Sequence, residues 1–192
     1  MRLCDVTLRE AVQLSDRGYT VDQRVAAGEA LDRLDLSFVQ AGFPAVDETE
    51  REVTATLTNR LDAEVVAIAR GVESDVTAAL ETGADVVELF VPVSDKQLEH
   101  VVGTSREAMY ETAGERITQI REGGAQPHLT LMDGFRTDER AVASAFERFD
   151  CPIVVADTVG ARTPSYVAGY LRTLADLGVD LSRAGVHFHD DL

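Results

Sequence analysis

The sequence predicts an α/β fold, namely a (β/α)8 or TIM barrel of which about seven βα units are present. Short, almost wholly apolar segments alternate with amphipathic helical segments, as in a parallel sheet whose two faces are buried by helices. Distinctive polar residues also follow nearly every apolar segment. A barrel collects these strand ends at one mouth, which favours it over the alternative of a doubly wound sheet.

The apolar segments define the strands, and the segments between them define the helices. Strands are expected over residues 3–7, 37–41, 64–69, 85–91, 127–132, 152–156 and 186–189. Helices are expected over residues 22–34, 47–57, 74–81, about 94–121, 137–149 and 163–178. The last of these begins with Thr163-Pro164, an N-cap residue followed by the proline that suits the first helical position.

These units are expected to form a single catalytic barrel domain over residues 1–192, which ends before an eighth βα unit. A sheet of seven strands would keep two unpaired edges, which native proteins avoid. We therefore expect either a fragment of a barrel or a chain that a partner completes. We also expect the protein to form a homo-oligomer.

The charge of the chain is strongly negative. Lys+Arg is 18 and Asp+Glu is 34, for a net charge of −16, and Lys96 is the only lysine. Acidic residues spread along every predicted helix indicate a halophilic protein from a cytoplasm rich in salt, where the repulsion is screened. The charge argues against binding to nucleic acid or to an anionic membrane. Because neither a signal peptide nor a disulfide framework is recognisable, we expect a cytoplasmic protein.

Two histidines alternate with apolar residues in Val186-His187-Phe188-His189, near the end of the sequence. This is the period of a strand, so His187 and His189 are expected on one face, where both imidazoles can bind one metal ion. Asp190 and Asp191 follow at once. The alternative is a strand end with two incidental histidines, and the spacing favours the metal site.

Residues after the other strands could complete such a site. Glu10 is a candidate third ligand, because two imidazoles and one carboxylate leave positions open for a substrate. Arg9 would be a fixed cation beside an oxygen that gains negative charge, although Arg9 and Glu10 could also be a plain surface ion pair. Arg136 could clamp a substrate carboxylate or merely begin a helix.

Four motifs carry a resemblance to a known family. They are Asp5-Val6-Thr7-Leu8-Arg9-Glu10-Ala11-Val12-Gln13, Gln40-Ala41-Gly42-Phe43-Pro44, Ala156-Asp157-Thr158-Val159-Gly160 and His187-Phe188-His189-Asp190-Asp191-Leu192. In this order, the motifs resemble those of the metal-dependent acyl-CoA condensing enzymes, which are the isopropylmalate, homocitrate and citramalate synthases. Hydroxymethylglutaryl-CoA lyases share the barrel. The amidohydrolases also use a His-x-His pair, but on the first strand, which argues against them.

The resemblance implies a site and a reaction. Glu10, His187 and His189 would bind a divalent metal ion (Mg, Mn or Zn), which chelates the keto and carboxylate oxygens of an α-keto acid. Arg9 would stabilise the alkoxide that develops as an enolate derived from acetyl-CoA attacks the keto carbon. The keto acid would be bound by Gln13, Gln97, Arg136 and Thr158. Hydrolysis of the thioester would then give a 2-hydroxy dicarboxylic acid precursor in amino-acid biosynthesis, for instance of leucine.

The sequence also departs from the motifs of this family. Gln40 stands where the family usually has glutamate, Gln97 stands where many synthases have histidine, and Ala11 replaces a glycine. An amide at position 40 cannot take up a proton. Two alternatives therefore stay open: a lyase that cleaves a hydroxyacyl-CoA, and an inactive, partial barrel with a structural or partner role. Asp191-Leu192 and Gln13 favour the synthase over the lyase.

Overall fold

In the computed structural model, residues 2–13 and 18–190 are described. The chain divides into two compact units. Unit 1 comprises Met1–Leu89 and Arg116–Pro127, and unit 2 comprises Phe90–Glu115 and His128–Leu192.

Seven strands form one sheet in the order β1-β2-β3-β4-β5-β6-β7. Their bounds are Cys4–Asp5 (β1), Phe38–Gly42 (β2), Glu64–Arg70 (β3), Val86–Pro92 (β4), Gln126–Met132 (β5), Ile153–Asp157 (β6) and Ala184–Phe188 (β7). β2 pairs in parallel with β1 and β3 in unit 1, and β6 pairs in parallel with β5 and β7 in unit 2. A parallel sheet in sequence order, with a helix in each crossover, confirms the predicted partial (β/α)8 barrel.

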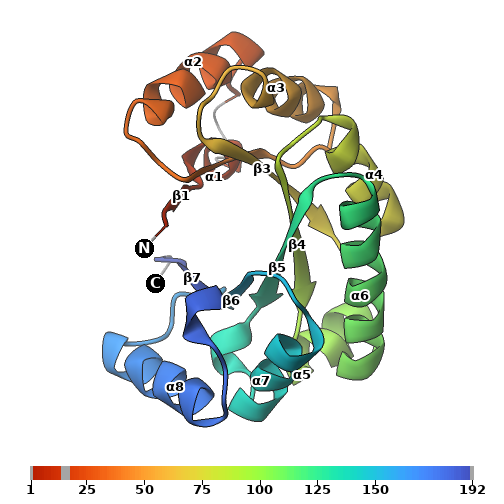
Figure 1. Cartoon of the computed structure of the whole chain (residues 1–192), viewed down its shortest axis with the longest axis vertical. Coiled ribbons are helices and arrows are strands. Elements are labelled where there is room, and N and C mark those ends of the chain that lie inside the picture. Colours follow the sequence, from red (N-terminus) through yellow and green to blue (C-terminus); the bar gives the residue numbers. More distant parts are fainter. Residues whose placement is uncertain (1, 14–17, 191–192) are drawn as a thin grey trace. The chain divides into compact units, whose positions relative to one another are not determined.

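The helices lie in the connections between the strands (Figure 1). The α-helices are Thr7–Ala11 (α1), Val21–Asp32 (α2), Glu48–Thr58 (α3), Glu73–Glu81 (α4), Asp95–Gln97 (α5), Arg106–Glu122 (α6), Glu139–Arg148 (α7) and Pro164–Asp176 (α8). A π-helix, Leu98–Val102 (η1), and two 3-10 helices, Gly134–Arg136 (η2) and Leu181–Arg183 (η3), complete them. α2 packs beside α3 in unit 1, and α7 packs beside α8 in unit 2.

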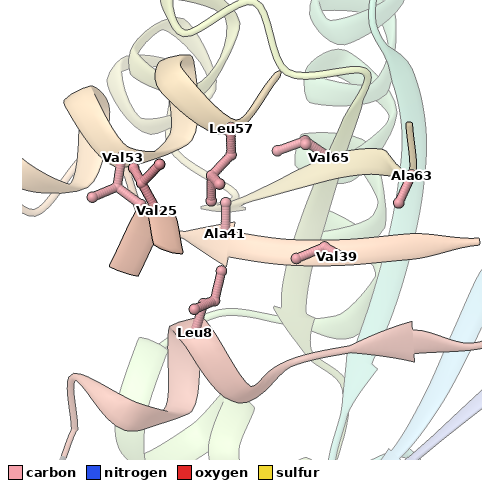
Figure 2. Packing of buried hydrophobic residues seen from close by; sticks show 8 residues of the cluster. All are labelled: Leu8, Val25, Val39, Ala41, Val53, Leu57, Ala63 and Val65. Carbon is pink, nitrogen blue, oxygen red and sulfur yellow. The ribbon is translucent and has the colours of Figure 1, made fainter. Parts of the chain in front are cut away.

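A core cluster in unit 1 joins the first elements of the fold (Figure 2). Leu8 of α1 points toward Ala41 of β2, so the short first helix is anchored by one apolar side chain. Val25 of α2 and Leu57 of α3 belong to the same buried cluster. Burial of these side chains fixes where α1 begins and therefore where the polar residues that follow Leu8 lie.

Two elements differ from their prediction. Thr7 was expected at the end of a strand but lies in α1, because the Asp5 carboxylate accepts hydrogen bonds from the Thr7 backbone N–H (2.9 Å) and hydroxyl (3.2 Å) and turns the chain. The helix expected over 94–121 is broken. Gly103 takes a left-handed conformation (φ 70°), and α6 restarts after Ser105, whose hydroxyl accepts from the N–H of Ala108.

The other helices and strands agree with the sequence to within one or two residues at most ends. Across residues 2–13 and 18–190, none of the helices combines the length and apolar character that crossing a bilayer requires. The single domain, the oligomeric state and the cytoplasmic location stay predictions.

Candidate active site

The predicted site residues are divided between the two units. Unit 1 holds Arg9, Glu10 and Gln13, and unit 2 holds Gln97, Arg136, Thr158, His187 and His189. Within each unit, the structure shows which of these side chains meet and what holds them.

Arg9 is held by side chains on both sides. Its Nη2 lies 2.6 Å from Glu10 Oε1, and its Nε donates a hydrogen bond of 2.8 Å to Gln40 Oε1. Only 15% of the Arg9 side chain is exposed, against 33% for Glu10. Arg9 and Glu10 therefore do form an ion pair, but it differs from the surface pair considered as the alternative, because the guanidinium is largely buried.

Gln40 connects Arg9 to a second acid. Its Nε2 donates a hydrogen bond of 2.8 Å to Glu88 Oε2 in β4, and Gln40 is only 3% exposed. The neighbours fix the direction of this amide, because a guanidinium can only donate and a carboxylate can only accept. Glu88, Gln40 and Arg9 thus form a chain of hydrogen bonds that gives the guanidinium one orientation.

A buried ion pair binds the backbone at the end of β2. Arg24 of α2 binds Glu50 of α3 through both guanidinium amino groups, and 4% and 7% of these side chains are exposed. Arg24 Nη2 also donates to the Ala41 carbonyl at 2.9 Å, and Glu50 Oε2 accepts from the Phe43 N–H at 2.8 Å. Both charges are thus paired and bonded to the backbone, which is what burial of a charge requires.

This environment gives a stability prediction. Glu50→Gln would remove one charge and leave Arg24 as an unpaired buried cation, so the free energy of unfolding should fall by about 3 to 5 kcal/mol. Urea unfolding in molar KCl measures it. The matched control is Glu29→Gln, which breaks the exposed Arg60–Glu29 pair and should cost less than about 1 kcal/mol. A comparable small cost for both variants would contradict the prediction.

His187 in β7 and His189 directly after it point to the same face of the strand end, as predicted. Their Nε2 atoms are 3.2 Å apart, and both rings are partly buried. Phe188, on the opposite face, stacks on the buried Phe135 with ring centroids 5.6 Å apart. The backbone N–H of His189 donates to the carbonyl of Asp157. The stacked ring and the backbone bond fix the strand end that carries the two imidazoles.

The donor set fits a divalent metal ion. Two metal–nitrogen bonds of about 2.1 Å, at angles between a right angle and the tetrahedral one, place the nitrogens about 3.0 to 3.4 Å apart. The observed 3.2 Å between the two Nε2 atoms lies inside this range. Two imidazole nitrogens suit Zn or Fe, and a carboxylate as the third donor also suits Mn or Mg.

A second polar cluster lies where β5 and β6 end. Asp133 is buried in a left-handed conformation (φ 61°), and its carboxylate accepts from Arg136 Nε (2.5 Å) and Nη2 (2.9 Å). These hydrogen bonds are the main cause that raises the pKa of Arg136. The Asp133 N–H donates to Thr158 Oγ1 at 2.8 Å, so the Thr158 hydroxyl hydrogen can point elsewhere. Arg136 and Thr158 are thus brought together through Asp133.

Gln97 and Gln13 have less support around them. The Gln97 N–H donates to the hydroxyl of Ser94, the N-cap residue of α5, at 3.4 Å. Its side-chain Oε1 is buried and accepts no hydrogen bond from the described part of the chain. Gln13 is exposed in the turn after α1. Asp190 is exposed, and Asp191-Leu192, which favoured the synthase form, lie outside the described residues.

Sequence reasoning missed three charged residues of unit 1. Glu88 has a clear signal, because it is the only charged residue in the apolar segment Val86–Pro92. Arg24 and Glu50 lie on helices among many other charges, so their burial has no comparable signal in the sequence.

Known proteins are similar over the whole chain. A family model described as HMGL-like matches residues 1–192. A homocitrate synthase AksA of Methanosarcina mazei is 30% identical over 198 residues, which are 100% of this chain and 48% of the relative. A "Probable 2-isopropylmalate synthase" of Archaeoglobus fulgidus is 32% identical over 100% of this chain and 39% of the relative. The chain thus spans about half or less of the length of these curated relatives.

A solved structure is similar in fold. It is an HMG-CoA lyase from Acinetobacter baumannii in complex with coenzyme A and 3-methylmalate, with a TM-score of 0.79 and 20% identity. The match covers 99% of this chain and 67% of that one. Such a likeness supports the fold, and the family follows from the sequence match. Because that match extends over residues 1–192, the chain belongs to the HMGL-like family.

Proposed function

We propose that this chain carries the site of a metal-dependent synthase that condenses acetyl-CoA with an α-keto acid. The observation that carries the proposal is the pair of imidazoles with Nε2 atoms 3.2 Å apart, since this spacing suits one divalent ion. The sequence relatives are named homocitrate and isopropylmalate synthases, which favours condensation over cleavage.

His187, His189 and Glu10 would hold the metal ion. When bound, the ion supplies a Lewis acid that polarises the keto carbonyl of the substrate. Glu10 stands one residue after Arg9 and is paired with it, so the carboxylate is already fixed in direction. That Glu10 completes the ligand set is part of the proposal.

Arg9 would donate hydrogen bonds to the keto oxygen as this oxygen gains negative charge. A guanidinium that Gln40 and Glu10 already hold needs little reorganisation at that moment, which is the condition for electrostatic stabilisation. Gln13, Gln97, Arg136 and Thr158 would bind the keto acid. Arg136 can donate from the part of its guanidinium that Asp133 leaves open, and the Gln97 amide would bind through its NH2 group, because the oxygens of a keto acid only accept.

The test is release of free CoA thiol from acetyl-CoA with manganese or magnesium, with pyruvate, 2-oxoisovalerate and 2-oxoglutarate assayed separately. We expect thiol release with one keto acid and not with the others. Running the assay from low salt to molar KCl also tests the predicted salt adaptation, which expects higher activity at high salt. Size-exclusion chromatography with light scattering under the assay conditions tests the predicted homo-oligomer.

The alternatives give different results in the same experiment. A lyase would release no thiol with any keto acid but would cleave a hydroxyacyl-CoA into a shorter acyl-CoA and a keto acid. An inactive partial barrel would do neither and could still bind manganese. Either result would overturn the synthase proposal.

A further inference from the structure

β2 contains an irregularity directly after Gln40. Gln40 pairs with Val66 of β3, but the next partner, Ala67, pairs with Gly42, so Ala41 is an extra residue and forms a β-bulge. A bulge redirects the side chains around it and frees backbone groups from the ladder. The direction of the Gln40 side chain therefore depends on how this bulge is held.

The buried Arg24–Glu50 pair binds the backbone at the bulged residue and two residues after it. Arg24 Nη2 donates to the carbonyl of Ala41, and Glu50 Oε2 accepts from the N–H of Phe43. Between them, Gly42 has no side chain, and a Cβ there would lie 2.2 Å from Glu50 Oε2. A residue with a side chain at position 42 would push the carboxylate away, so this arrangement of the ion pair requires glycine beside the bulge.

Two helices deliver these charges to the strand. Arg24 lies in α2 and Glu50 in α3, and apolar side chains of the same helices pack on β2 in the core cluster. The ion pair thus connects both helices to the backbone at the end of β2. Gln40 directly precedes the bulge and accepts a hydrogen bond from Arg9. The position of the bulge can therefore affect Arg9 through this one residue.

We infer that the buried Arg24–Glu50 pair is a positioning device for Arg9. It fixes the bulge at Ala41, the bulge directs the amide of Gln40, and Gln40 orients the guanidinium. Arg24 and Glu50 are therefore positioning residues for the reaction, in addition to their contribution to stability. The inference rests on the proposed function for its effect on rate, whereas its structural part concerns Arg9 alone.

The first measurement reads the orientation of Arg9 without activity. Hydrogen exchange of the Arg9 Nε–H is followed by ¹⁵N NMR, with the signal assigned by its loss in Arg9→Lys. We expect a protected Nε–H in the parent protein. The variant Arg24→Met combined with Glu50→Leu removes both buried charges together. Exchange of the Arg9 Nε–H should then be about tenfold faster, because the charge-assisted hydrogen bond from this group to Gln40 is weakened. Arg60→Met, which breaks an exposed pair in the same unit, should leave the signal unchanged.

The second measurement separates a positioning role from a purely structural one. The double variant should lower kcat about tenfold and keep the KM of the keto acid within about twofold. The reason is that it changes only the orientation of the Arg9 guanidinium, which acts in the transition state. Gln40→Met should cause the same loss. Adding it to the double variant should cause no further loss, because both act through one hydrogen bond.

Each outcome decides the inference. Unchanged protection of the Arg9 Nε–H in a folded double variant would overturn it, and so would an additive loss with Gln40→Met. If the double variant does not fold, Arg24→Lys replaces it. One ammonium cannot serve Glu50 and the Ala41 carbonyl as the guanidinium fork does, so intermediate protection is expected and full protection would refute the role. If the parent protein releases no thiol, the proposed function fails, and the exchange measurement still decides the positioning.

Discussion

His187→Ala is expected to abolish the binding of manganese while leaving the helical circular dichroism signal nearly unchanged. Removal of an outer-shell partner already costs about 10- to 100-fold in metal affinity, so loss of a direct ligand should exceed this range. His187 is partly buried near the end of β7, and its replacement should leave the stacking of Phe188 on Phe135 intact. Titration of free Mn²⁺ by electron paramagnetic resonance in molar KCl gives the affinity directly.

The matched control for this variant is His100→Ala. His100 lies in η1, and 69% of its side chain is exposed. Its loss should leave the manganese affinity within about twofold, since an exposed histidine alone makes a weak site. Manganese binding that survives in His187→Ala at the parental affinity would place the metal site elsewhere in the protein.

Arg9→Met should lower the rate of thiol release by about 10²- to 10³-fold, the loss that follows removal of one donor to a developing oxyanion. Because the interaction is made in the transition state, kcat and kcat/KM should fall together and the KM of the keto acid should change little. Steady-state kinetics in saturating manganese measure both. Methionine keeps the apolar stem of the side chain, so the buried surroundings of the residue are largely preserved.

Arg33→Met serves as the control, because it removes the same charge from an exposed position after α2. Its rate should stay within about twofold of the parent, as the charge lies in solvent and is screened in salt. A loss of less than about tenfold in Arg9→Met would exclude Arg9 as the donor to the reacting oxygen.

The parallel βα architecture could be predicted from the sequence because its signals are local. Each strand is an apolar run, and each helix carries its own start, such as Thr163-Pro164 at the beginning of α8. The histidine pair could be predicted for the same reason, since two side chains at strand period must share a face. The break at Gly103 was missed because glycine in a helical pattern predicts a stop only when its left-handed conformation is known.

The environment of Arg9 could be predicted only in part. The sequence identifies Arg9 and Glu10 as neighbours. The hydrogen bond between Arg9 and Gln40, however, depends on a bulge that no residue pattern in the sequence predicts. The bulge in turn depends on Arg24 and Glu50, which are 26 residues apart and come together only when α2 packs beside α3. Buried charge networks of this kind are products of tertiary packing, so local propensity carries no information about them.

The fixed direction of the Gln40 amide also constrains how this part of the sequence can diverge. A glutamate at position 40 would accept from Arg9 but would face the Glu88 carboxylate, and one of two acids at that distance must hold a proton. An amide at both positions would remove one of the negative charges near the guanidinium. Exchanging acid and amide between positions 40 and 88 together keeps the net charge, the bond from Arg9 and the bond between the two side chains. A change between acid and amide at either position alone therefore alters the number of carboxylates in this hydrogen-bonded chain, whereas the paired exchange does not.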